Sequence, residues 1–174
     1  MTSRLDNTAE HLKDEEIAVV TYDVQRILLP TDGSANSIEA MNVAMGIAKL
    51  HGAEVVACFV HPGHSVDPLE EVAIEQSEGV HHSTAGLRCA KVSAEKNGVP
   101  LRTVVAEGAI ARAILTTARE EECDLIVIGH TGRGAMQRLM LGSVAEAVVR
   151  DADVPVLVIK HCSTKFCTVA RTDA

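Results

Sequence analysis

Residues 24–34 read Val-Gln-Arg-Ile-Leu-Leu-Pro-Thr-Asp-Gly-Ser, an apolar run that passes directly into a turn-forming sequence. This pattern predicts a buried strand followed by a loop, because proline, aspartate and glycine favour turns. A helix is expected next, since Asn36 and Glu39 have the spacing of a capping box and Gly52 stands where a helix would end. Residues 24–52 therefore predict one strand, one loop and one amphipathic helix.

The same alternation continues along the chain. Further apolar runs with strand character occupy residues 55–60, 101–106, 125–128 and 154–159. Helical patterns separate them, at residues 68–97, 110–122 and 142–151. The first of these helices is expected to be irregular, because Gly79 and Gly86 weaken it. Strands that alternate with helices predict right-handed crossovers, and hence an α/β fold with a parallel, doubly wound sheet and helices on both faces.

Composition indicates one globular domain. The chain has 174 residues, of which 47% are hydrophobic and 23% charged, so it can form one ordinary core. We expect this domain at residues 24–160, with an N-terminal extension at 1–23 and a C-terminal tail at 161–174. The formal net charge of −8 and the 2% of aromatic residues argue against nucleic acid as a partner, because a phosphate backbone would be repelled and bases would find few stacking platforms.

The distribution of apolar and cysteine residues points to a cytoplasmic protein. No apolar run approaches the roughly 18 residues that cross a bilayer, and the acidic N-terminal segment lacks the pattern of a signal peptide. We therefore expect no membrane partner. The five cysteines are odd in number and scattered, which favours free thiols in a reducing compartment over a disulfide framework.

The loop after the fourth strand has the composition of an anion site. Residues 129–143 read Gly-His-Thr-Gly-Arg-Gly-Ala-Met-Gln-Arg-Leu-Met-Leu-Gly-Ser. Glycines let the backbone approach a ligand closely, and the helix that follows offers unpaired N–H groups and the positive end of its dipole. Gly129-x4-Gly134 has the glycine spacing of a Walker loop. The segment is not such a loop, because Ala135 and Met136 stand where lysine and a hydroxyl residue should follow Gly134. It also lacks the third glycine of a dinucleotide-binding loop.

The spacing Gly129-x2-Gly132-x9-Gly142-Ser143 resembles the nucleotide loop of the universal stress protein family, in its ATP-binding branch. Further stretches share the resemblance at the expected separations, at residues 27–34, 107–108, 124–129 and 154–160. The resemblance covers residues 24–160. It implies a Rossmann-like sheet of five parallel strands in the order 3-2-1-4-5, and ATP, with or without Mg²⁺, as the ligand.

The resemblance also implies a set of binding residues. Asp32 matches the acidic residue at the adenosine end, with Pro30 and Thr31 beside it, and Val60 matches the position whose backbone meets adenine. The loop that wraps ribose and phosphates is matched by Gly129, Gly132, Arg133, Gly142, Ser143 and Val144. The chemistry agrees, because a carboxylate accepts from ribose hydroxyls and a helix N-terminus donates to phosphate. A homodimer through the last strand is implied as well, and Pro155 favours an edge position for that strand.

Several of these residues also have plain structural explanations. Asp32 could simply form a turn, and Ser143 with Glu146 has capping-box spacing. The joint spacing favours the binding interpretation, and for Ser143 both roles can coexist. Arg138 is expected to be a solvated charge, and His130 is expected to line the site without acting as a base. The histidines fit no recognised zinc pattern, so we single out no metal ligand. We also single out no catalytic residue.

Three functions remain open from the sequence. The favoured one is a cytoplasmic stress-response module that binds ATP and passes its occupancy to a regulatory protein partner, which the sequence does not identify. The second is a slow ATPase, or a nucleotidyl or phosphoryl transferase, of the adenine-nucleotide alpha-hydrolase group. The third is a nucleotide-free dimeric scaffold. No general base or nucleophile constellation accompanies the loop, so at most slow hydrolysis is expected.

Overall fold

The structure is a computed structural model that describes residues 22–62, 79–132 and 141–160. Its sheet contains five parallel strands in the order β3-β2-β1-β4-β5. Their bounds are β1 (Arg26–Pro30), β2 (Glu54–His61), β3 (Leu101–Glu107), β4 (Leu125–Gly129) and β5 (Val156–Ile159). The predicted fold class, the five predicted strands and the implied strand order are thereby confirmed.

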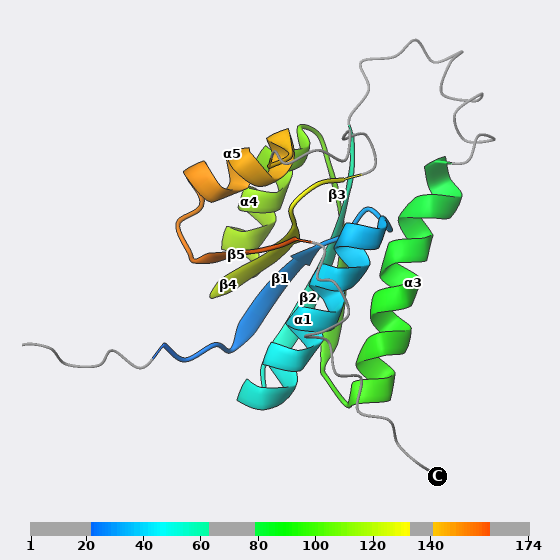
Figure 1. Cartoon of the computed structure of the whole chain (residues 1–174), viewed down its shortest axis with the longest axis vertical. Coiled ribbons are helices and arrows are strands. Elements are labelled where there is room, and N and C mark those ends of the chain that lie inside the picture. Colours follow the sequence, from blue (N-terminus) through cyan, green and yellow to red (C-terminus); the bar gives the residue numbers. More distant parts are fainter. Residues whose placement is uncertain (1–21, 63–78, 133–140, 161–174) are drawn as a thin grey trace, which may run out of the picture.

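Four helices are present in the described residues: α1 (Ala35–His51), α3 (Gly79–Asn97), α4 (Ile110–Glu120) and α5 (Ser143–Asp151). The helix predicted at residues 68–97 is confirmed from Gly79 onward, and residues 63–78 lie outside the described part of the chain. Figure 1 shows α1 and α3 on one face of the sheet and α4 and α5 on the other. No helix in the described part of the chain is long and apolar enough to cross a membrane.

The core has two halves because successive residues of a strand point to opposite faces. In β1, Ile27 and Leu29 are buried against the α1 and α3 layer, whereas Leu28 is buried against the α4 and α5 layer. Strand β4 follows the same rule, and Leu28 lies opposite Ile126 in the register of these two neighbours. Burial on both faces explains why these strands read as continuous apolar runs.

The predicted end of α1 at Gly52 is confirmed, because Gly52 is its C-cap with φ +71°. Both predicted N-caps, at Asn36 and Ser143, are wrong. The N-cap of α1 is Ser34, whose side chain accepts a hydrogen bond from Ser37 N at 3.3 Å, so the helix starts one residue before Asn36. The N-cap of α5 is Gly142, which makes no side-chain capping bond, so Ser143 is the first helical residue and forms no capping box with Glu146. In each case the helix begins earlier than the spacing indicated, because a residue already at the loop end has the extended φ and ψ of a cap.

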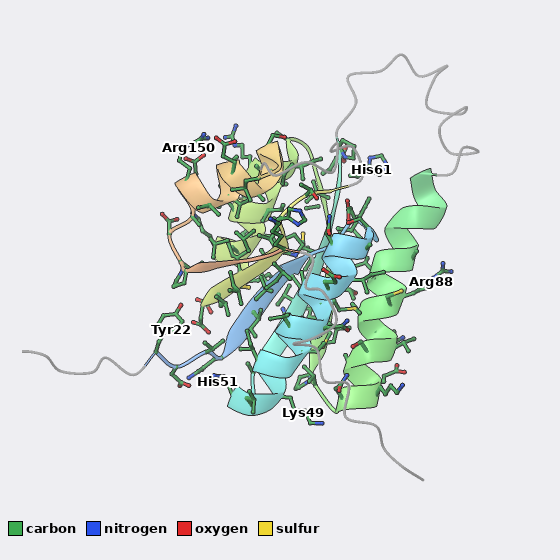
Figure 2. All side chains as sticks on the ribbon, in the orientation of Figure 1. Tyr22, Lys49, His51, His61, Arg88 and Arg150 are labelled. Atoms are coloured by element: carbon green, nitrogen blue, oxygen red, sulfur yellow. The ribbon has the colours of Figure 1, made fainter. Side chains whose placement is uncertain are left out.

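The amino ends of the strands are tied by charged groups. The Arg26 side chain bridges to Glu54 at 3.0 Å and donates to the Glu121 carbonyl at 2.6 Å, while Arg102 bridges to Glu121 at 3.0 Å. In Figure 2, Tyr22 lies at this end of the sheet and His61 lies at the opposite end. These charged residues therefore tie the amino ends of the strands together, and they lie away from the carboxyl ends of the strands.

Candidate functional site

A cavity of about 540 Å³ opens at the carboxyl ends of β1, β2 and β4. This is the point where the chain leaves β1 for one face of the sheet and β4 for the other, and ligands bind doubly wound sheets there. The residues that line it are Pro30, Thr31, Asp32, Ser37, Cys58, Phe59, Val60, Ile110, Ile114, Ile128, Gly129, Thr131, Gly132, Gly142, Ser143, Val144 and Ala145.

The structure brings together nine of the ten residues that the sequence analysis singled out. Pro30, Thr31, Asp32, Val60, Gly129, Gly132, Gly142, Ser143 and Val144 all line the one cavity. The tenth, Arg133, lies outside the described residues, as does Arg138. The placement of the nine lining residues around one cavity makes a common site possible. The role of each residue toward a ligand stays a prediction.

Asp32 belongs to a tightly held turn. Its Oδ1 accepts a hydrogen bond from Ser34 N at 2.9 Å, which is the turn-forming role that the sequence left open. Gly33, between these two residues, has φ +72°, a left-handed conformation that favours glycine. The turn aims the other carboxylate oxygen toward the second loop, since a Cβ built on Gly132 would lie 2.9 Å from Asp32 Oδ2. The structural and the site roles of Asp32 therefore coexist.

The two loops are also joined by a side chain that the sequence analysis took for a helix cap. Asn36, in the first turn of α1, donates through Nδ2 to Thr131 Oγ1 at 2.6 Å and to the Thr131 carbonyl at 3.2 Å. These bonds connect positions 95 residues apart in the chain. Gly129 permits this approach, because a Cβ there would lie 2.9 Å from the backbone carbonyl group of Asn36.

One wall of the cavity is apolar. Ile110 and Ile114 of α4 line it together with Val60 and Ile128 from the ends of β2 and β4. Both isoleucines belong to the helix predicted at residues 110–122, and their i, i+4 spacing places them on one face of it. Asp32 is the one charged residue among the described residues that line the cavity. Such a site suits a ligand with a flat apolar part, hydroxyl groups and an anionic end.

The second loop is held by backbone bonds at both of its described ends. His130 N donates to the Ile159 carbonyl at 2.8 Å, and Gly142 N donates to the His130 carbonyl at 2.8 Å. His130 was expected to line the site, but it is not among the residues that line the cavity. Its half-buried ring instead has an Nδ1 without a hydrogen-bond partner among the described residues. The N-terminus of α5, at Ser143, opens onto the cavity.

The fold and this cavity define a class of protein: a Rossmann-like α/β protein with a ligand site at the switch point of its sheet. The sequence pattern of the universal stress protein family matches residues 23–160, and the chain belongs to that family.

Individual proteins that are similar to this chain are also universal stress proteins. The chain is 39% identical over 142 residues to the universal stress protein MJ0531 of Methanocaldococcus jannaschii, covering 78% of this chain and 82% of that one. The solved structure of UspA from Lactobacillus plantarum is similar, with a TM-score of 0.70, 28% identity and coverage of 80% and 99% of the two chains. A universal stress protein solved in complex with cAMP gives a TM-score of 0.63 at 27% identity, with coverage of 81% and 99%.

We predict that Asn36→Ala lowers the free energy of unfolding by about 1 kcal/mol, because it removes both bonds to Thr131 and leaves that carbonyl without its partner. Urea denaturation followed by circular dichroism measures the change. Asn42→Ala is the matched control, since Asn42 is an exposed residue of the same helix. Equal stability of the Asn36 variant and the wild type would show that the bonds do not hold the loops together.

We also predict selective alkylation of the cysteines. Burial raises the pKa of the Cys58 thiol, and burial raises the pKa of Cys123 to about 12. Because the thiolate is the nucleophile, a raised pKa slows reaction at pH 8, so iodoacetamide should modify the exposed Cys89 well before these two residues. Peptide mass spectrometry over a time course follows each site, and a sample in urea gives the unprotected rates. Similar native rates at all three cysteines would contradict the prediction.

Proposed function

We propose that this universal stress protein binds an adenine nucleotide, ATP with or without Mg²⁺, as a regulatory stress-response module. The observation that carries the proposal is the meeting of Asp32 and Gly132, from two distant loops, over one cavity that has an apolar wall. The family membership supports it, as does the similar universal stress protein that was solved with cAMP.

Each part of the cavity suits one part of the nucleotide. The apolar walls of Val60, Ile110 and Ile128 suit the flat adenine ring. The Asp32 carboxylate is an acceptor for ribose hydroxyls. The phosphates would meet the N-terminus of α5 at Ser143, with Arg133 as a proposed further contact. One carboxylate among the described lining residues favours holding ATP over hydrolysing it rapidly.

The first experiment is to denature freshly purified protein and to identify any released nucleotide by mass. Calorimetric titration with ATP, ADP and AMP then gives the affinities. We expect Gly132→Val to weaken ATP binding by about tenfold or more, or about 1.4 kcal/mol, because its side chain would enter the space beside Asp32 Oδ2. Gly132→Ala should have a smaller effect.

Circular dichroism checks that the Gly132 variants remain folded. Unchanged ATP affinity in the folded valine variant would refute the assigned site. Protein that carries no nucleotide and gives no heat with ATP would refute nucleotide binding altogether, and would revive the interpretation as a scaffold.

We further propose that the protein is a cytoplasmic homodimer that pairs through β5. Strand β5 is an edge of the sheet, Pro155 precedes it, and Leu157 is 37% exposed. An edge strand offers unpaired backbone groups to another chain. The free thiols of Cys58, Cys89 and Cys123 fit a reducing compartment.

Analytical ultracentrifugation tests the dimer. We expect the wild type to sediment as a dimer and Leu157→Lys to shift it toward monomer, because a lysine would be placed on the pairing edge. Val92→Lys is the matched control, since Val92 is an exposed apolar residue of α3, away from β5. A monomeric wild type, or a dimer that the Leu157 variant leaves intact, would contradict pairing through this strand.

A further inference from the structure

Gly86 occupies an unusual place in α3. A glycine inside a helix is unfavourable, because alanine forms helices better. Here the glycine is buried, and a Cβ at this position would lie 2.6 Å from Thr31 Oγ1 and 3.0 Å from Gly33 N. Gly46 in α1 offers the comparison, since a Cβ there would have no neighbour within 4 Å. The absence of a side chain at position 86 therefore has a specific reason, which is contact with the turn after β1.

The atoms that Gly86 touches hold the Asp32 turn in shape. Thr31 Oγ1 donates to Ser37 Oγ at 3.3 Å and accepts from Gly33 N at 3.3 Å. The next backbone amide, Ser34 N, donates to Asp32 Oδ1. A displacement of Thr31 or of the Gly33 amide is therefore transmitted within one or two residues to the Asp32 carboxylate.

Neither partner in this contact can retreat freely. Helix α3 is anchored in the core by Ala90 and Ala94, which are both buried against the sheet. Thr31 is buried and its backbone N donates to the Cys58 carbonyl at 2.8 Å. Rotation of the Thr31 side chain would relieve its own contact and would leave the backbone contact with Gly33 N. The part of the structure that must yield is the turn at residues 32–34.

We propose that Gly86 is a positioning residue for the nucleotide site: helix α3 approaches the turn so closely that only a glycine at this place leaves Asp32 in reach of the ribose hydroxyls. The inference rests on the proposed nucleotide binding and extends it to a residue on another helix. Alanine at position 86 would displace the carboxylate without removing any group from the cavity.

The test compares Gly86→Ala with Gly46→Ala by calorimetry. We expect Gly86→Ala to weaken ATP binding by about tenfold, since binding sites require their groups within about 0.5 Å. The affinity ratio of ATP to 2′,3′-dideoxy-ATP should also fall toward one, because the lost contact is the one to the ribose hydroxyls. Gly46→Ala should leave both quantities unchanged. A purely structural role for Gly86 would alter melting temperature without altering the ratio.

A second background tests whether the effect passes through Thr31. In Thr31→Ala protein the side-chain atoms that Gly86 faces are gone, so adding Gly86→Ala should cost less affinity than it does in the wild type. The amide resonances of Gly33 and Ser34, recorded without nucleotide, should shift in Gly86→Ala and stay in place in Gly46→Ala.

The outcomes separate this inference from the proposed function. Wild-type protein that binds no ATP refutes the proposed function. Wild-type protein that binds ATP, together with a Gly86→Ala variant of equal affinity and equal ratio, refutes the positioning role alone. Unshifted Gly33 and Ser34 resonances in Gly86→Ala refute it as well, whatever the nucleotides do.

Discussion

Strands β1 and β4 lie side by side in the sheet and are followed by helices on opposite faces, and this divergence underlies the rest of the site. Both strands are buried on two faces, so their register is fixed by core side chains such as Leu28 and Ile126. The loops that follow must part, and the space between them becomes the cavity. The position of the cavity is thus a consequence of how the hydrophobic core is packed.

Close approach at three glycines, together with the hydrogen bonds from Asn36 to Thr131, shapes this end of the molecule. Gly129 lets the first turn of α1 approach β4, Gly132 leaves space beside Asp32, and Gly86 lets α3 approach the turn after β1. A Cβ at any of the three would come within 3.0 Å of a neighbouring atom. Each glycine therefore allows a different close contact, although the sequence alone does not distinguish them. The contacts at Gly132 and Gly86 both involve the turn that carries the Asp32 carboxylate, at residues 31–33.

Much of the fold could be predicted because it depends on neighbours along the chain. The apolar runs at the five strands and the glycine stops after the helices are local signals, and the structure follows them closely. The N-caps predicted at Asn36 and Ser143 were wrong, because both residues have the spacing of a capping box although the helices already begin before or at them. The loops end sooner, at Ser34 and Gly142, which are the N-caps of α1 and α5. Asn36 instead bonds Thr131, a partner that spacing could not indicate. Ile110 and Ile114 fall within a predicted helix, and nothing in the local pattern indicates that their face meets a cavity.

The sequence by itself determined the alternation of strands and helices and the α/β class. These properties are encoded by side chains a few positions apart, whose periodicity reflects one face of a helix or strand. The residues expected at the site came from the resemblance of the loops to those of the universal stress protein family. Only the tertiary structure decided which distant atoms meet: Asp32 with Gly132, Asn36 with Thr131, and Gly86 with Thr31. Such contacts depend on the strand register and on how closely each helix lies on the sheet, and both are set by the packing of the whole core.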